Sequence, residues 1–543
     1  MLANPSMELS GRAGPARECE FMRRALCVWC CVCALLACDP GSVPAAVTLP
    51  AILGDHMVLQ ADQPLRIWGW AEPGEEVSVD LAGDRQSTHA NASGEWRVNL
   101  SPRKSSRETL TMTVSAPSGT VTVRDILVGE VWLGSGQSNM GWPLHLATDA
   151  KAEIAQAKYP EIRLFFVPVG TAATPQSKIA SGWVVCSPET VPGFSAVLYF
   201  FGRDLHVALQ QPVGLIASAV GGTRIEPWMP STSFSETPSL AGEWQSIRDS
   251  LAQYSAARLE HLRQTRAWLI EVDKLQAENR DFPDAPIPPA HPLNGFAAPT
   301  SLYNAMIHPI VPFTLRGVIW YQGESNRGQG MHYHDLQTGL IEGWRKTWQQ
   351  GEFPFLFVQL APFRYDDNAT LLPELWEAQT AGLKLPHTGM AVITDISTIG
   401  DIHPPNKKEV GRRLSLWALH DTYGRDVVPS GPLWTEHRVE EGTIRVRFRH
   451  AAGLKTRDGS PPDWFSIAGE DRRFVAATAQ IDGETVIVRS PEVAQPVAVR
   501  FGWNQVAEPN LINGAGLPAS PFRTDRWTDA RNAPLPSRAE TKP

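Results

Sequence analysis

The chain has 543 residues and a mass of 59.6 kDa, so two or three domains of the usual ~100–200 residues are expected. Hydrophobic residues make up 43% and charged residues 20%, which excludes a wholly disordered chain. Lys and Arg number 49 and Asp and Glu number 57, so the net charge is −8 and the pI is about 6.0. Because such a chain without basic blocks is poorly suited to bind phosphate backbones, no nucleic-acid partner is expected.

The first 45 residues are typical of an export signal. Arg23 and Arg24 precede an apolar run over residues 25–37, which is too short to cross a bilayer but has the length of a signal-peptide core. Leu35-Leu36-Ala37-Cys38 resembles a bacterial lipobox, which would attach lipid to Cys38, and cleavage after Ala45 is the alternative. The sequence therefore predicts an exported protein without a membrane span, periplasmic, anchored to the outer membrane as a lipoprotein, or extracellular.

Residues 46–124 alternate between apolar and polar side chains, with turn signals between short runs. Val77, Val79 and Leu81 form one such run, and Pro73-Gly74 marks a turn before it. This pattern predicts an N-terminal β-sandwich.

Residues 125–428 have a different pattern, in which apolar runs are separated by helical stretches and Gly-containing loops. The runs cover residues 126–133, 213–220, 311–321 and 355–360. They are typical of strands buried on both faces of a mostly parallel sheet, which indicates an α/β core. An insertion is expected at about residues 237–292. Apolar residues at helical spacing begin a long helix there, which extends as far as Leu275; they are Trp244, Ile247, Leu251 and Tyr254.

Alternation returns after residue 428. Ile444, Val446 and Phe448 share one face of a predicted strand, and Asp482-Gly483 is a typical hairpin turn. We therefore predict a C-terminal β module over residues 429–530 and a polar tail over residues 531–543.

A Gly-rich turn follows the predicted strand over residues 126–133. It reads Gly134-Ser135-Gly136-Gln137-Ser138-Asn139-Met140. Open α/β sheets hold ligands at the carboxyl ends of their strands, and a serine that starts the next helix presents its own N–H to an oxyanion. Ser138 is therefore a candidate nucleophile, although serines in Gly-rich turns are usually turn or cap residues. Met140 excludes the Gly-x-Ser-x-Gly elbow.

His403 is the candidate base, in the loop Gly400-Asp401-Ile402-His403-Pro404-Pro405. A predicted helix follows, with Asn406 as its N-cap and Glu409 three residues later. Its apolar stripe consists of Val410, Leu414 and Trp417. An acid is needed to orient the imidazole. Asp401 would do so if the loop is extended, since residues two apart then project to the same side, and Asp395 is the alternative.

Two more loops follow predicted strands and contain hydrogen-bond donors. Asn326 ends the stretch Trp320-Tyr321-Gln322-Gly323-Glu324-Ser325-Asn326, and its amide would donate to a developing negative charge. Gly222, in Val220-Gly221-Gly222-Thr223-Arg224, would offer a backbone N–H. Candidate substrate-binding residues in these loops are Gln137, Arg224, Gln322 and Glu324. Arg224 or Arg327 would pair with a sugar carboxylate, although an arginine beside such a loop is more often structural.

These motifs resemble those of the sialate O-acetylesterase family within the SGNH (GDSL-type) hydrolases. The resemblance rests on residues 136–140, 320–326 and 401–404, with outlying matches at residues 55–60 and 516–525. It covers roughly residues 46–527. It implies an α/β fold with a flavodoxin-like α/β/α core, flanked by N-terminal and C-terminal β-rich modules. It also implies hydrolysis of acetyl esters on carbohydrates without a metal or another cofactor.

The resemblance carries roles to individual residues. Ser138 would be the nucleophile, His403 the base, and Gly222 and Asn326 would join the Ser138 N–H in the oxyanion hole. The wider superfamily places its acid three residues before the histidine, and Gly400 occupies that position here. Asp401 is therefore our prediction for the acid, with Asp395 or a backbone carbonyl as alternatives.

Two classes of protein fit these observations. The first is a serine esterase that removes O-acetyl groups from carbohydrates; O-acetylated sialic acid is the expected substrate, and acetylated xylan or another plant or algal polysaccharide is the alternative. The second is a non-catalytic glycan-binding protein. The combination of Ser138, Asn326 and His403 favours the esterase. The sequence has no His-Glu-x-x-His motif, P-loop or dinucleotide fingerprint, so neither a metal nor a nucleotide cofactor is expected.

Overall fold

The computed structural model describes residues 46–528 and the backbone of residues 531–532. The predicted export signal, the lipid site at Cys38 and most of the polar tail lie outside these residues. In the part that is described, no helix has both the length and the apolar character needed to cross a membrane.

The N-terminal part is built from strands, as the alternation predicted. Strands β2 (Leu65–Trp70) and β5 (Glu95–Leu100) pair with each other. A second sheet contains β1 (Val58–Gln60), β3 (Glu76–Leu81), β4 (Asp84–His89), β6 (Ser106–Ala116) and β7 (Gly119–Gly136). Val77, Val79 and Leu81 of β3 point into the core, while the residues between them are only partly buried.

Strand β7 continues from this N-terminal sheet into the α/β core. Its first part pairs with β6, and its second part pairs with β10 (Val213–Ala219) and β11 (Gly317–Tyr321). From Ile126 onward β7 is buried at every position, as expected for a strand covered on both faces. The boundary predicted after residue 124 therefore falls inside one continuous strand.

The core sheet has the strand order β13-β12-β11-β7-β10-β8-β9. Its remaining strands are β8 (Tyr159–Phe166), β9 (Trp183–Cys186), β12 (Phe355–Val358) and β13 (Thr388–Ala391). Six strands of this sheet are parallel, in the order β8-β10-β7-β11-β12-β13, and the antiparallel β9 lies beside β8 at one edge. Without β8, the order β10-β7-β11-β12-β13 is the 2-1-3-4-5 order of the flavodoxin-like fold. The order reverses between β7 and β11, which is where such sheets bind ligands.

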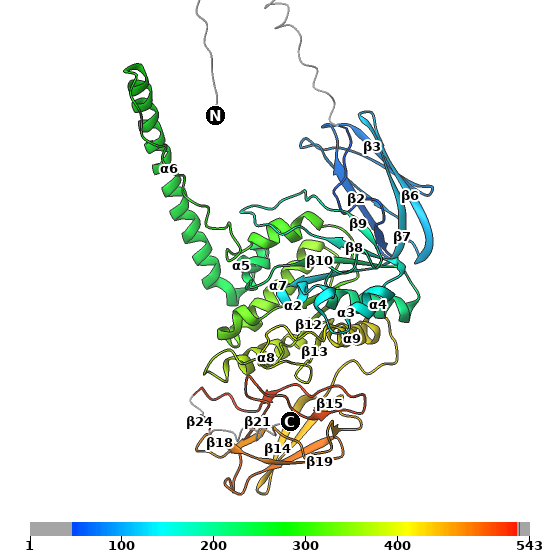
Figure 1. Ribbon diagram of the computed structural model, residues 1–543, viewed down its shortest axis with the longest axis vertical. Helices are drawn as coiled ribbons and strands as arrows, with labels where there is room; N and C mark the ends of the chain where they lie inside the picture. The colour runs from blue at the N-terminus through cyan, green and yellow to red at the C-terminus, as the bar shows by residue number, and fades with distance from the viewer. Residues whose placement is uncertain (1–45, 529–530, 533–543) are drawn as a thin grey trace, which may run out of the picture.

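Helices cover both faces of this sheet and complete the α/β/α arrangement (Figure 1). Helices α4 (Ala196–Leu209) and α9 (Lys407–Trp417) lie on one face, where Leu198 fills the space above Gly134 and Trp417 the space above Gly389. Helix α7 (His332–Trp348) lies on the other face, with the rings of Trp344 and Trp320 6.0 Å apart. Helix α8 (Leu371–Ala381) packs beside α7.

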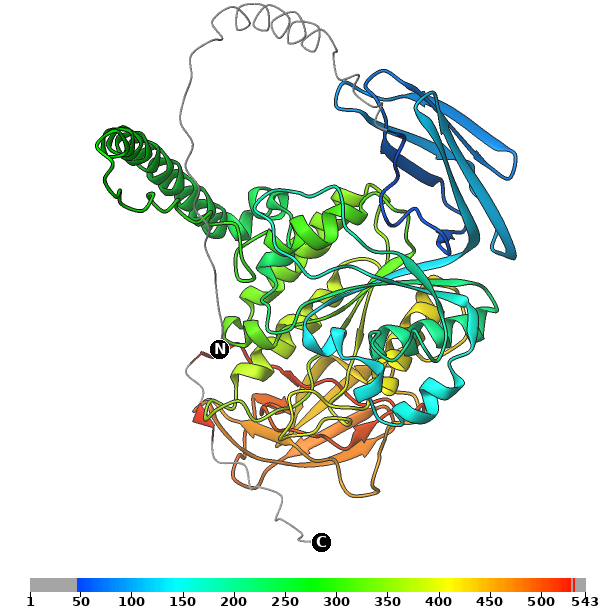
Figure 2. The same cartoon turned by 45° about the horizontal axis from the view of Figure 1, so that its top comes forward.

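The insertion forms a long helix that projects from the core. Helix α6 runs over Ala241–Ala277, close to the predicted range, and only Ile247 and Leu275 of its residues are buried. Figures 1 and 2 show this arm and the N-terminal strands at separate corners of the core. The segment that returns from the arm packs along it, with the rings of Tyr254 and His291 4.6 Å apart.

The C-terminal part has its own hydrophobic core and two larger sheets. One sheet contains β14 (Leu433–Glu440), β15 (Thr443–Arg449), β20 (Thr485–Arg489) and β19 (Thr478–Asp482). The other contains β23 (Phe522–Arg523), β21 (Ala498–Phe501), β17 (Phe465–Ala468), β18 (Arg473–Ala476) and β24 (Arg531–Asn532). The predicted hairpin turn is confirmed: Asp482 pairs with Thr485, and Gly483 has a φ of 61°.

Candidate active site

Ser138 lies at the end of β7, at the point where the strand order reverses. Helix α2 (Ser138–Gly141) begins there, two residues after the strand ends at Gly136. Gly136 has a φ of 136°, and a Cβ at this position would lie 2.2 Å from the carbonyl oxygen of Tyr321. The glycine therefore lets the ends of β7 and β11 approach closely. The N–H of Gln137 donates to that same carbonyl over 3.0 Å.

His403 lies against this serine, although 265 residues separate them. The Nε2 atom of His403 is 2.8 Å from the Oγ atom of Ser138, within hydrogen-bond distance. The imidazole stacks on the indole of Trp142, with ring centroids 4.7 Å apart and 19° between the planes. Burial and the nearby Lys407 ammonium lower the pKa of His403, while Asp401 opposes them. The ring is therefore held neutral and able to accept a proton.

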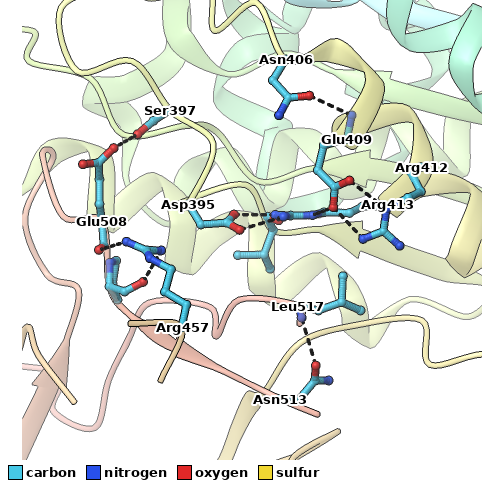
Figure 3. A network of polar contacts seen from close by, with 12 residues as sticks. Asp395, Ser397, Asn406, Glu409, Arg412, Arg413, Arg457, Glu508, Asn513 and Leu517 are labelled. Carbon is cyan, nitrogen blue, oxygen red and sulfur yellow. Dashed lines mark hydrogen bonds and ion pairs between the residues drawn. The ribbon is translucent and has the colours of Figure 1, made fainter. Parts of the chain in front are cut away.

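The two candidate acids occupy different surroundings. The Oδ1 atom of Asp401 accepts the backbone N–H of His403 over 2.8 Å and lies 3.9 Å from its Nδ1 atom, with the side chain 53% exposed. Asp395 instead accepts two hydrogen bonds from Arg413, over 2.6 and 2.8 Å (Figure 3). Asp401 is thus the carboxylate beside the imidazole, while Asp395 is held by the guanidinium of α9.

The Gly221-Gly222 turn packs against Ser138. A Cβ on Gly221 would meet the Cβ of Ser138 at 3.2 Å, and the N–H of Val220 donates to Gly136 over 3.1 Å. Within residues 46–528, no backbone or side-chain hydrogen bond uses the N–H of Ser138 or of Gly222 as its donor. Both N–H groups are available to a ligand.

Asn326 lies deeper than the sequence suggested. Its Nδ2 atom donates to Glu226 over 3.0 Å and to Gln329 over 2.7 Å, so both amide hydrogens are used. Its Oδ1 atom accepts from the N–H of Ile225 over 3.0 Å and from Gln322 over 2.7 Å. The oxyanion role of Asn326 stays a prediction, and it requires one of the two donated bonds to open.

Two candidate substrate-binding residues, Gln137 and Gln322, are buried, and Glu324 is partly buried. Gln322 donates to the carbonyl of Thr223 over 3.1 Å and accepts from Tyr333 over 2.9 Å. Glu324 accepts from Asn139 over 2.6 Å, and burial raises its pKa. Their contact with substrate stays a prediction, and their buried positions favour a role in holding the loops together.

The two arginines considered for carboxylate recognition already have acidic partners. Arg224 pairs with Glu226 over 2.7 Å, and this carboxylate also holds Asn326. Arg327 pairs with Asp366 over 2.6 Å and lies over the ring of Tyr365. A substrate carboxylate would have to compete with these intramolecular pairs.

Sequence reasoning missed two residues next to the dyad of Ser138 and His403. Trp142, four residues after Ser138, supplies the surface on which the imidazole stacks, and no pattern in the sequence marked it. Lys407 is fully buried at the start of α9, where a lysine would ordinarily be taken as exposed. Its place four residues after His403 was the available signal.

A parallel α/β sheet with a Ser–His pair at its switch point defines a serine-type hydrolase fold. A family model described as "Carbohydrate esterase, sialic acid-specific acetylesterase" matches residues 290–416. The mouse sialate O-acetylesterase is 32% identical over 500 residues, which cover 83% of this chain and 88% of the mouse protein. The human sialate O-acetylesterase is 31% identical over 87% of this chain and 91% of its own length.

A solved structure agrees with these relatives. It is described as a novel carbohydrate acetylesterase from Xanthomonas citri, and it is 37% identical to this chain. The TM-score is 0.75, with 89% of this chain and 100% of the other covered. The chain belongs to the sialate O-acetylesterase family, a family of carbohydrate esterases.

Proposed function

We propose that this chain is a serine esterase that removes O-acetyl groups from carbohydrates, with O-acetylated sialic acid as the first candidate substrate. The observation that carries the proposal is the 2.8 Å contact between Ser138 Oγ and His403 Nε2 at the switch point of the sheet. The names of the mouse and human relatives support sialic acid as the substrate. A non-catalytic glycan-binding protein would have no need for this contact.

The geometry suggests a two-step reaction. His403 Nε2 takes the proton of Ser138 as its Oγ attacks the acetyl carbonyl carbon, and the N–H groups of Ser138 and Gly222 hold the resulting oxyanion. Asn326 is the third predicted donor, once its bond to Glu226 opens. The imidazolium then gives its proton to the departing sugar oxygen. In the second step His403 deprotonates a water molecule, which attacks the acetyl-enzyme, releases acetate and restores Ser138.

One observation favours a neutral polysaccharide, such as acetylated xylan, as the second candidate substrate. Sialic acid carries a carboxylate, whereas Arg224 and Arg327 are already paired with Glu226 and Asp366. A neutral sugar would leave both ion pairs intact. Acetate release from O-acetylated sialic acids, acetylated xylan oligomers and acetylated pectin therefore ranks the candidates directly.

The matched experiment uses the Ser138→Ala variant on the same substrates. We expect the wild-type chain to release acetate from O-acetylated sialic acid and the variant to lose activity by a factor of about 10³ or more, because no other group forms the acetyl-enzyme. Acetate release from xylan alone would change the assigned substrate to a neutral polysaccharide and would still support the esterase activity. A variant that keeps about one tenth of the wild-type rate would contradict the proposed nucleophile.

Export is proposed on residues 23–38 alone, with lipid attachment at Cys38 as its specific form. The mass of the mature N-terminal peptide tests this. A diacylglycerol-sized increment on Cys38 is expected, and a free N-terminus after Ala45 would contradict lipidation.

A further inference from the structure

Three polar side chains, two buried and one partly buried, lie next to the dyad and have no place in the reaction described above. They are Asn139, Glu324 and Lys407, here called the polar cluster, and they come from three separate elements: α2, the 3-10 helix Glu324–Gln329 and α9. The ammonium of Lys407 donates to Asn139 Oδ1, and Asn139 Nδ2 donates to Glu324 Oε1 over 2.6 Å. Because charged and polar groups are costly to bury, a cluster of this kind needs a reason.

The cluster connects the two halves of the dyad. Asn139 directly follows Ser138, and its Nδ2 atom also donates over 3.0 Å to the carbonyl of Ile402, the residue before His403. One amide therefore ties the serine helix to the histidine loop. Lys407, in turn, holds that amide from the first residue of α9.

The ammonium of Lys407 also lies beside the aromatic ring that carries the imidazole. It is 5.6 Å from the centroid of the Trp142 ring, on which His403 stacks, and 5.4 Å from the Tyr321 ring. The charged groups that act on Lys407 are Glu324 and Asp401, and those that act on His403 are Lys407 and Asp401. Burial lowers the pKa of Lys407 to about 7, against the attraction of the two carboxylates.

We propose that Lys407 is a positioning residue of the esterase: through Asn139 and Glu324 it fixes the Ser138 helix against the His403 loop, and it places a positive charge beside the Trp142 ring on which His403 stacks. The inference rests on the proposed esterase function. In a serine triad, the acid stabilises the positively charged imidazolium. The cation of Lys407 has the opposite effect on the charged form of His403. Here the only carboxylate that acts on His403 in the described residues, Asp401, is half exposed.

The test is the pH profile of kcat/KM for p-nitrophenyl acetate, measured between about pH 4 and 9, where the acidic limb reports the pKa of the free-enzyme base. In Lys407→Gln, which keeps a donor for Asn139 but removes the charge, we expect the acidic limb to move to higher pH. The plateau should fall by about ten- to a hundredfold, since small displacements of reacting groups cost that much. In Asp401→Asn the limb should move the opposite way, to lower pH.

The direction in which the acidic limb moves in Lys407→Gln and in Asp401→Asn separates this inference from a purely structural role of Lys407. A purely structural Lys407 would lower the plateau and leave the acidic limb in place, and that result would overturn the inference while the loss of activity in Ser138→Ala still upheld the esterase. If Lys407→Gln does not fold, NMR titration of the wild-type His403 ring and Lys407 ammonium answers the same question. A second inflection of His403 at the pKa of Lys407 supports the inference, and independent titrations overturn it.

Discussion

Asp395 precedes the loop that carries His403 and Asp401 lies within it, and their partners give the two residues different roles. Asp395 is 13% exposed and holds the 5% exposed guanidinium of Arg413 through two hydrogen bonds (Figure 3). The same guanidinium also binds Glu409 of α9 over 2.9 Å. Its bonds to Asp395 and to the carbonyl of Val392 join α9 to the segment that follows β13. Asp401 instead faces solvent and accepts the backbone N–H of His403.

This difference predicts that the same substitution has unequal effects on the free energy of unfolding at the two positions. Asp395→Asn should lower the free energy of unfolding by about 3 kcal/mol, because Arg413 then keeps a buried charge with one carboxylate fewer. Asp401→Asn, the matched control, should change it by about 0.5 kcal/mol or less, as is usual for exposed positions. Urea unfolding curves of the two variants measure both values. Equal stabilities would show that Asp395 is not the structural member of the pair.

At the scale of elements, the position of His403 depends on how α9 packs against α4. Gly411 of α9 has no side chain at the contact, and a Cβ there would lie 2.7 Å from Phe200 Cβ and 2.8 Å from the carbonyl oxygen of Val197. Two backbones therefore meet with no room for a methyl group. The loop that carries His403 ends where α9 begins, so this contact fixes the helix that follows the loop.

Gly411→Ala should therefore destabilise the protein by about 1–3 kcal/mol, the usual cost of overpacking. Gly242→Ala is the matched control: it lies in α6, where a Cβ would have nothing within 4 Å. Alanine favours helix there, so the control should be neutral or slightly stabilising. Thermal unfolding measures both, and a stable Gly411→Ala variant would contradict close packing of the two helices.

Local patterns predicted many elements correctly, and contacts between distant segments account for what they missed. The N-cap was confirmed, because the Asn406 side chain accepts the N–H of Glu409, and so was the hairpin at Gly483. Both depend on neighbouring residues. The sequence could not show that β7 crosses between two sheets, since each half has a strand pattern suited to its own surroundings.

In the candidate site, too, local patterns predicted the local features and missed the contacts between distant segments. Turn chemistry placed Ser138 and Gly222 after strands, where parallel topology gathers them, and placed His403 in a loop before a helix. The hydrogen bonds of Asn326 to Glu226, and of Lys407 to Asn139, join residues 100 and 268 positions apart. No local pattern encodes such partners.

For the whole molecule, one hydrophobic core extends from the N-terminal strands through the α/β sheet, while the C-terminal strands pack around a second core. Helix α6 contributes little to either, since its outer part exposes large apolar side chains, including Leu259, Leu262, Leu269 and Ile270. The arm is thus separable from the catalytic unit. It returns on itself where Tyr254 meets His291.

Excision of residues 258–287, with a short Gly-Ser linker in their place, should therefore leave the rest of the fold and the site intact. We expect kcat/KM for p-nitrophenyl acetate to stay within about twofold of the wild type, because long surface insertions carry little folding free energy. A loss of activity beyond tenfold in a soluble, folded variant would mean that the arm supports the active site.

The central claim is that Ser138 is the one serine activated by His403. A fluorophosphonate probe followed by peptide mass spectrometry tests it most directly, because the probe reacts with a serine that a neighbouring base activates. The account predicts a single modified peptide containing Ser138 in the wild-type chain and loss of that modification in His403→Ala. Modification of a different serine, or equal labelling of Ser138 in the two proteins, would contradict it.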